Sequence, residues 1–244
     1  KRNDLLDMLG EINEEADIYT SIIPTNAAWI ETYNKILPFY KSGTRANPNN
    51  PQSLITNNPK LQVSRTKWNL IKDMLFHDKI DLPTGADSLI STYGTIYKNP
   101  DYLFAGASKN ELSNGFAYVT NQMKNKTTDA WLKTIRVETE QNTYGLITTE
   151  NCDLEIRSTF GTDFPASNNY YARFSNLPSN LRTKVSAKFP IPNTLSNVKY
   201  NIYCVFVPTS AISAETQVPY ALNFYMSYYN NNGIFQTDVA IGAS

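Results

Sequence analysis

The amino-acid sequence predicts an α+β fold in two domains: a mixed helix-and-strand domain over residues 1–125, then an antiparallel β-sandwich over residues 126–244. Two observations support this prediction. In the first half, apolar residues recur at helical spacing. After residue 130, short apolar runs are separated by Asn, Pro, Ser and Gly, which is typical of antiparallel strands. A chain of 244 residues can bury one large core or two modest ones.

Residues 18–36, IYTSIIPTNAAWIETYNKI, predict a strand that passes directly into a helix. The β-branched Ile22 and Ile23 suit a buried strand. Pro24 ends the strand pairing, and Thr25 or Asn26 can cap the helix by accepting a hydrogen bond from a free backbone N–H. A nucleophile elbow or a phosphate loop would need glycines that this stretch lacks. We therefore interpret it as an element of the fold and not as a catalytic loop.

Further helical patterns follow in the first half. One helix face after Pro24 is formed by apolar residues at i, i+4, i+7, i+8 and i+11, namely Trp29, Tyr33, Ile36, Leu37 and Tyr40. Pro38 should end or kink this helix. Residues 5–12 predict a short amphipathic helix, and residues 43–60, rich in Asn and Pro, predict a long surface loop. A second long helix is expected within residues 61–80, capped by Thr66 or Ser64, with a buried stripe at Val63, Trp68, Ile71, Leu75 and Ile80.

Short strands are expected throughout the rest of the chain. Residues 114–123, NGFAYVTNQM, predict a turn followed by a strand. The later strand candidates are 131–139, 143–149, 152–159, 170–177, 183–191, 199–208, 221–229 and 233–241. Residues 199–208, KYNIYCVFVP, are apolar on both faces and are therefore predicted to form a central strand. Residues 228–233, YYNNNG, should form a hairpin tip.

The charge and composition exclude several classes of function. Lys+Arg and Asp+Glu number 22 each, so no net field favours nucleic acid or an anionic membrane as a partner. The single histidine excludes a metal site built on several imidazoles, and we expect no metal and no cofactor. No run of about 18 apolar residues predicts a membrane span. The opening residues, KRNDLLDML, read like the inside of a longer protein, so we expect a fragment.

The two cysteines, Cys152 and Cys204, occupy inward-facing positions of predicted strands. Two cysteines are too few for a disulfide scaffold. Two buried free thiols are the first interpretation, because free cysteine is among the most buried residue types. A single disulfide bridge between them is the alternative.

The sequence contains few titratable residues that would indicate catalysis. His77, the one side chain that titrates near neutrality, stands at the end of an apolar helical pattern, where it can be a packed residue, a contact for a partner or a general acid or base. Asp73, Asp78 and Asp81 lack the spacing of an EF-hand loop and are interpreted as a solvated face. The carboxylates of residues 11–17, EINEEAD, could in principle pair for glycoside hydrolysis. They stand at a helix end before a turn, and we interpret them as solvated. We therefore expect no enzyme.

Tyrosine pairs are the best sequence indication of a ligand. The chain has 16 Tyr, and the pairs Tyr170-Tyr171 and Tyr228-Tyr229 stand beside Asn-rich turns. Neighbouring residues of a strand point to opposite faces, so one member of each pair can enter a core while the other stays outside. An exposed tyrosine beside amides could stack on a sugar ring, and we take Tyr171 and Tyr229 as candidate binding residues. Ordinary strand packing remains the first interpretation of these tyrosines, and ligand binding is the alternative.

The first half resembles the fasciclin-like domain family at three ordered places. Residues 19–29, YTSIIPTNAAW, are similar to the first signature of the family, with matches at Thr20, Pro24, Thr25, Asn26 and Ala28. Residues 69–80, NLIKDMLFHDKI, resemble the second signature, with Phe76-His77 where the family has Tyr-His. Residues 114–123 are similar to the closing strand of the family. In animal members the Tyr-His pair has been linked to receptor binding, so the resemblance makes Phe76 and His77 candidate binding residues.

The second half resembles the β-sandwich tails that follow fasciclin-like domains in surface proteins of Bacteroidetes-type gut bacteria, through KYNIYCVFVP and the bias to Asn and Tyr. The resemblance implies a non-catalytic adhesion or recognition protein at a bacterial cell surface. Such a protein would be secreted, or held at the outer membrane by a lipid anchor outside this chain, and its partner would be a surface protein or a glycan. The alternative is a glycan-binding accessory protein of a polysaccharide-uptake system, with its site in the sandwich.

Overall fold

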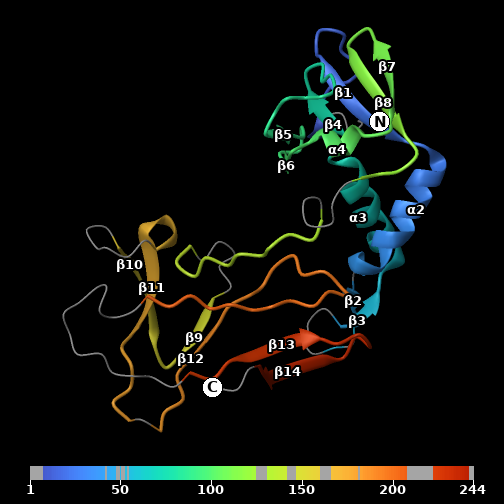
Figure 1. Ribbon diagram of the computed structural model, residues 1–244. Coiled ribbons are helices and arrows are strands. Elements are labelled where there is room, and N and C mark those ends of the chain that lie inside the picture. The colour runs from blue at the N-terminus through green and yellow to red at the C-terminus, as the bar shows by residue number, and fades with distance from the viewer. Residues whose placement is uncertain are drawn as a thin grey trace. The chain divides into compact units, whose positions relative to one another are not determined.

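The computed structural model describes residues 8–41, 43–47, 50, 53, 55–124, 131–141, 147–159, 166–180, 182–207 and 222–241 (Figure 1). It contains both helices and strands, which confirms the α+β class. Spatial proximity divides the chain into two compact units. Unit 1 comprises residues 1–133, 195–198 and 227–237, and unit 2 comprises residues 134–194, 199–226 and 238–244. The boundary expected between residues 125 and 126 lies outside the described residues.

Unit 1 is built on a four-stranded sheet with the order β4-β1-β8-β7. Its strands are β1 (Tyr19–Pro24), β4 (Leu75–His77), β7 (Ser108–Leu112) and β8 (Gly115–Thr120). β1 runs parallel to β8 and antiparallel to β4, although β1 and β8 are separated by most of the unit. Gly115 permits the close approach of β8 to β1, because a Cβ at this position would lie 1.7 Å from the Tyr19 carbonyl oxygen.

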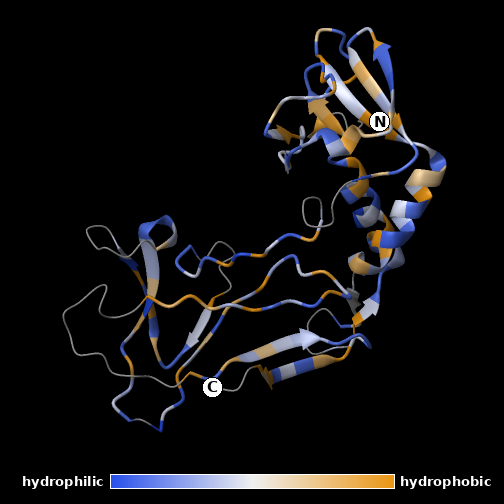
Figure 2. Cartoon of the chain, in the orientation of Figure 1, coloured by the Kyte–Doolittle hydropathy of each residue, from blue (hydrophilic) through white to orange (hydrophobic). Residues whose placement is uncertain are grey.

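The core of unit 1 lies against this sheet, and its largest fully buried side chains include Phe76, Tyr97 and Phe104. Figure 2 shows β4 in the colour of apolar residues. Two buried hydroxyl groups tie the segment after β4 to the sheet. Thr20 Oγ1 donates to the Asp78 carbonyl (2.7 Å) and accepts from the Ile80 N–H (2.9 Å). Tyr118 Oη donates to the Ile80 carbonyl (2.8 Å).

The expected strand-to-helix passage is confirmed. β1 ends at Pro24, and α2 (Asn26–Ile36) begins after Thr25, whose side chain accepts a hydrogen bond from the Ala28 N–H (3.4 Å). The helix gives way at Leu37 to the 3₁₀ helix η1 (Leu37–Tyr40), as Pro38 predicts. Ile36 and Tyr40 are buried beside Leu70, and Trp29 and Tyr33 pack against them, so the predicted helix face is confirmed.

Two predictions for residues 43–80 are wrong, and a third is wrong in part. β2 (Gly43–Arg45) and β3 (Ile55–Asn57) pair antiparallel within the expected loop. The second helix, α3 (Pro59–Ile71), begins earlier than expected, because the Asn58 side chain caps it by accepting from the Leu61 N–H (3.2 Å) and Pro59 favours a first helical position. Of the expected stripe, Leu75 and Ile80 are buried but lie beyond the helix, whereas the buried side chains of α3 itself are Thr66 and Leu70. Of the predicted helix 5–12, only Met8 and Leu9 among the described residues are helical.

Short elements complete unit 1. β5 (Ser88–Ile90) and β6 (Ile96–Lys98) form an antiparallel hairpin, and α4 (Asp101–Phe104) follows.

The second half contains the 3₁₀ helix η2 (Ser167–Asn169) and paired short strands: β9 (Thr148–Glu150) with β12 (Ser186–Lys188), β10 (Asp153–Ser158) with β11 (Tyr170–Ser175), and β13 (Tyr225–Tyr229) with β14 (Phe235–Ala240). The expected hairpin tip is confirmed, because Gly233 N donates to the Asn230 carbonyl (2.9 Å) and Asn230 N donates to the Ile234 carbonyl (3.0 Å). Figure 2 shows apolar residues at both ends of β14 and polar residues between them.

Two strand predictions in the second half are wrong. Residues 131–139 contain no strand. Residues 199–207, the expected central strand, belong to no strand among the described residues, and residues 199–206 are all exposed.

Candidate functional site

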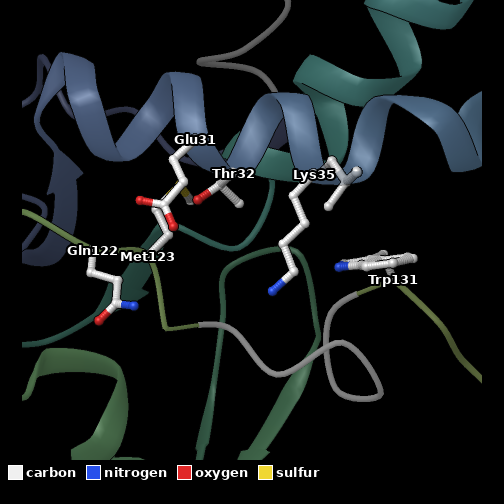
Figure 3. Close-up of a pocket in the computed structure, with 7 residues that line it drawn as sticks. Glu31, Thr32, Lys35, Gln122, Met123 and Trp131 are labelled. Atoms are coloured by element: carbon white, nitrogen blue, oxygen red, sulfur yellow. The ribbon is translucent and has the colours of Figure 1, made fainter.

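A small pocket in unit 1 lies beside α2 (Figure 3). Its volume is about 60 Å³. Successive turns of α2 supply one wall, the segment after β8 supplies a second, and an indole ring supplies a third; the lining residues are Glu31, Thr32, Lys35, Ile36, Gln122, Met123 and Trp131.

The walls of the pocket are fixed by packing. Ile36 is buried, and the Trp131 ring packs against the Phe39 ring of η1, with centroids 4.6 Å apart and an interplanar angle of 40°. Thr32 Oγ1 donates to the Ala28 carbonyl (2.9 Å), which holds this side chain against its own helix. Figure 3 shows the nitrogen-bearing edge of Trp131 turned toward the side of Lys35. The aromatic wall is therefore a fixed surface.

The polar groups of the pocket are available to a ligand. Glu31 and Lys35 are four residues apart, so both side chains leave the same side of α2. Within the described part of the chain, neither side chain forms an ion pair or a hydrogen bond. Figure 3 shows the carboxylate of Glu31 near Gln122 and the ammonium group of Lys35 between them and Trp131. A carboxylate, an ammonium, an amide and an indole N–H thus surround one small volume.

This set of groups suits a small hydroxylated ligand. The carboxylate accepts hydrogen bonds, the ammonium and indole N–H groups donate them, and the amide does both. A volume of about 60 Å³ holds roughly four water molecules, far less than the 300–1,000 Å³ or so of a pocket for a drug-sized molecule. The pocket can therefore take one sugar ring edge or a similar end group.

The pocket does not have the groups of a glycosidase. Glycoside hydrolysis generally uses two carboxyl groups on either side of the bond that is cleaved. Glu31 is the one carboxylate among the described lining residues, and Lys35 is exposed. The geometry supports binding, with no pair of groups positioned for acid–base chemistry among these residues.

The two candidate residues Phe76 and His77 differ in exposure, since the first is buried and the second is at the surface. Phe76 has an exposed fraction of 0% and packs in the core between Tyr97 and Phe104, so its side chain cannot contact a partner. His77 is exposed, and its ring lies 5.5 Å from the Tyr19 ring. His77 belongs to β4, and the expectation that it ends a helix is wrong because α3 stops at Ile71 and β4 pairs with β1.

The structure places Tyr171 and Tyr229 in half-buried positions, whereas their neighbours Tyr170 and Tyr228 are exposed. The Tyr229 ring packs against the Phe235 ring across the hairpin, with centroids 4.9 Å apart. Tyr171 belongs to unit 2 and Tyr229 to unit 1. The exposed member of each pair is therefore the one that the sequence analysis did not select.

The solvated face expected at Asp73, Asp78 and Asp81 is wrong for Asp73. Asp78 and Asp81 are exposed, and Asp81 pairs with Lys109. Asp73 has an exposed fraction of 1% and forms an ion pair with buried Lys72.

Both cysteines are free thiols. Cys152 is buried as expected, but the prediction of burial is wrong for Cys204, because the strand expected around it is not formed.

The sequence analysis did not identify the pocket. Glu31 and Lys35 look like the solvated side of an amphipathic helix, and Trp131 stands far along the chain. The available signal was an isolated Trp in the polar stretch TTDAWLK.

In the described residues, no helix has the length and apolar character needed to cross a membrane. Nor do the described His, Cys, Asp and Glu residues form a group of three or more that could hold a metal.

Comparisons of the chain with protein-family models, with curated proteins and with solved structures find no match.

Proposed function

We propose that this chain is a non-catalytic recognition protein that binds a carbohydrate end group in the pocket beside α2. The observation that carries the proposal is that the side chains of Glu31, Lys35 and Gln122 form no ion pair or hydrogen bond with other described residues and stand next to the packed indole of Trp131. Sugars offer hydroxyl groups that both donate and accept, together with apolar C–H faces, and this matches the mixed wall of the pocket.

The resemblance in residues 19–29, 69–80 and 114–123 supports placing this activity at a bacterial cell surface. In this proposal residues 1–125 form a fasciclin-like domain and residues 126–244 a β-sandwich, and an anchor outside this chain or secretion brings the protein to the surface. The partner is a glycan of another cell or of the host. Adhesion to a surface protein is the second candidate, and exposed His77 on β4 favours it as a contact residue.

A glycan array tests the proposal. The purified chain is compared with Glu31→Gln and Lys35→Met, which change one polar group each on the exposed side of α2 and should leave the fold intact. Glu15→Gln and Lys67→Met are matched controls, because both are exposed and neither lines the pocket. We expect saturable binding to one class of sugar, weakened in the first two variants and unchanged in the controls.

The same array includes Tyr171→Ala, Tyr229→Ala and His77→Ala. Loss of sugar binding in a tyrosine variant, with the pocket variants unchanged, would move the site to the strands of the second half. A silent array, together with capture of a purified surface protein that His77→Ala abolishes, would favour protein adhesion instead.

A further inference from the structure

The chain contains two Asn-Gly pairs, Asn114-Gly115 and Asn232-Gly233. In such a pair the backbone nitrogen of the glycine can attack the asparagine side chain, because glycine has no Cβ to hinder the approach. The attack requires a side chain that can turn and a backbone nitrogen that can leave its hydrogen bond. The two pairs should therefore react at rates that depend on how firmly the fold holds each of them.

Asn232 lies at the tip of the hairpin between β13 and β14. Its side chain is exposed and forms no hydrogen bond with another described residue. The Gly233 N–H donates to the Asn230 carbonyl (2.9 Å), and the Asn232 N–H donates to Asn230 Oδ1 (3.0 Å). These two bonds are local to the turn, and exposed turns open at a low free energy. The Gly233 nitrogen can therefore be released without unfolding either strand.

Asn114 is held by the sheet of unit 1. Its Nδ2 donates to the Ile12 carbonyl (3.1 Å), and its own carbonyl accepts from the Tyr19 N–H (3.0 Å). Gly115 is buried and begins β8, which pairs with β1 on one side and β7 on the other. Release of this pair requires β8 to separate from two neighbouring strands, which costs far more than opening a turn.

We propose that Asn232 is a site of spontaneous deamidation in the native protein and that Asn114 is protected. The Gly233 nitrogen gives its proton to the solvent and attacks Asn232 Cγ. The N–Cγ bond forms, the Cγ–Nδ2 bond breaks, and ammonia leaves, so that a succinimide ring remains. Water then opens the ring. No atom is oxidised or reduced, and water is the only co-reactant.

The bond that water cleaves decides the product. Cleavage between the ring nitrogen and Cγ gives aspartate, whereas cleavage between the ring nitrogen and the main-chain carbonyl carbon gives isoaspartate. Asn230 and Asn231 precede Asn232 in the same turn, but each is followed by an asparagine, whose Cβ hinders the attack. Deamidation in this turn should therefore be confined to the third of the three asparagines.

Isoaspartate would change the contact of the hairpin with β3. The Gly233 carbonyl accepts from the N–H of Ile55, the first residue of β3 (3.0 Å). Isoaspartate carries the main chain through its own side chain and so adds one chain atom directly before Gly233. The added atom displaces the Gly233 carbonyl from the Ile55 N–H and the Gly233 N–H from the Asn230 carbonyl. The modification should therefore loosen the hairpin tip from β3.

Peptide mapping by mass spectrometry tests the proposal on the purified chain, after incubation at mildly alkaline pH. Chymotrypsin isolates residues 230–235 and trypsin isolates residues 110–124, so each Asn-Gly pair is read in its own peptide. The mass gain of replacing NH₂ by OH should accumulate at Asn232 about tenfold or more faster than at Asn114, because each 1.4 kcal/mol or so of opening free energy slows a reaction about tenfold.

Urea and a matched variant separate the effect of the fold from that of the sequence. In urea both pairs are unfolded, so the two rates should become equal. Asn232→Gln should abolish the signal in the turn and leave Asn231 unmodified, because glutamine would have to close a larger ring. Equal rates at Asn232 and Asn114 in the folded chain would overturn the proposal. An Asn232 that reacts in urea but not in the folded chain would overturn it as well.

Hydrogen exchange tests the consequence for the contact with β3. In the isoaspartate form the Ile55 N–H should exchange faster than in the unmodified chain. The Tyr19 N–H, which bonds to the other pair, should exchange at an unchanged rate. An Ile55 N–H that exchanges equally in both forms would contradict the expected loosening.

Discussion

A buried ion pair joins the end of α3 to the β5–β6 turn. Lys72 and Asp73 are paired while both are buried, Asp73 Oδ1 accepts from Ser91 Oγ (2.9 Å), and the Lys72 ammonium lies 5.0 Å from the centroid of the Tyr93 ring. Taking a charge out of water costs several kcal/mol, so each member depends on the other. The hydrogen bond from Ser91 and the contact of Lys72 with Tyr93 join the turn to the end of the helix. Loss of either charge would leave the other buried without a counter-charge.

Asp73→Asn tests this dependence. Asparagine still accepts a hydrogen bond from Ser91, but it leaves the Lys72 ammonium buried without a counter-charge. We expect the free energy of unfolding to fall by about 3 kcal/mol or more, measured by urea denaturation at pH 7. Asp87→Asn, on an exposed side chain, is the control and should change it by less than about 0.5 kcal/mol. Equal effects of the two substitutions would contradict the account.

Asp101 makes a pH-dependent contribution to the free energy of unfolding. The hydroxyl and the backbone N–H of Thr84 both donate to Asp101 Oδ1 (2.6 and 2.9 Å), and these bonds lower the pKa of the carboxyl. The contribution of a lowered pKa to stability is present above the pKa of the unfolded chain, about 4, and is lost as pH falls through the folded value. Stability curves of the protein and of Asp101→Ala should therefore be separated at pH 5–7 and converge below about pH 4. A constant separation across this range would show that the carboxylate is not responsible.

At the scale of elements, the N-cap of α2 decides where β1 becomes a helix. Thr25 satisfies the Ala28 N–H, which otherwise has no partner within the helix. Thr25→Ala should reduce the free energy of unfolding by about 1 kcal/mol, whereas Thr25→Ser keeps the hydroxyl and should lose little. Thermal denaturation of both variants measures the difference. A loss in Thr25→Ser as large as in Thr25→Ala would assign the effect to the methyl group instead of the cap.

Elements set by adjacent residues could be predicted from the sequence, and elements set by distant pairing could not. The β1–α2 passage depends on Pro24 and Thr25, and the turn before β14 depends on Asn230 and Gly233, so both were predicted. The run that ends at His77 continues a helical apolar pattern, but pairing with β1 makes its last residues a strand. Within the Asn- and Pro-rich residues 43–60, β2 and β3 pair antiparallel, which the composition does not indicate.

At the scale of the whole molecule, the candidate pocket depends on contacts that a local pattern does not contain. The pocket brings Trp131 beside Glu31 and Lys35, and the sequence alone offers no reason to place the indole on that side of α2. Residues 199–207 have the composition of a central strand, which was predicted, but composition does not specify which strand they pair with.

The most direct test of the central claim, that a sugar enters the pocket beside α2, is the set of indole N–H signals in a ¹H–¹⁵N spectrum. The chain has 3 Trp, and only Trp131 lines the pocket; Trp131→Phe assigns its signal. On titration with the sugar selected by the array, the Trp131 signal should shift and saturate while those of Trp29 and Trp68 stay in place. Saturable binding with an unmoved Trp131 signal, or equal shifts of all three, would contradict the claim.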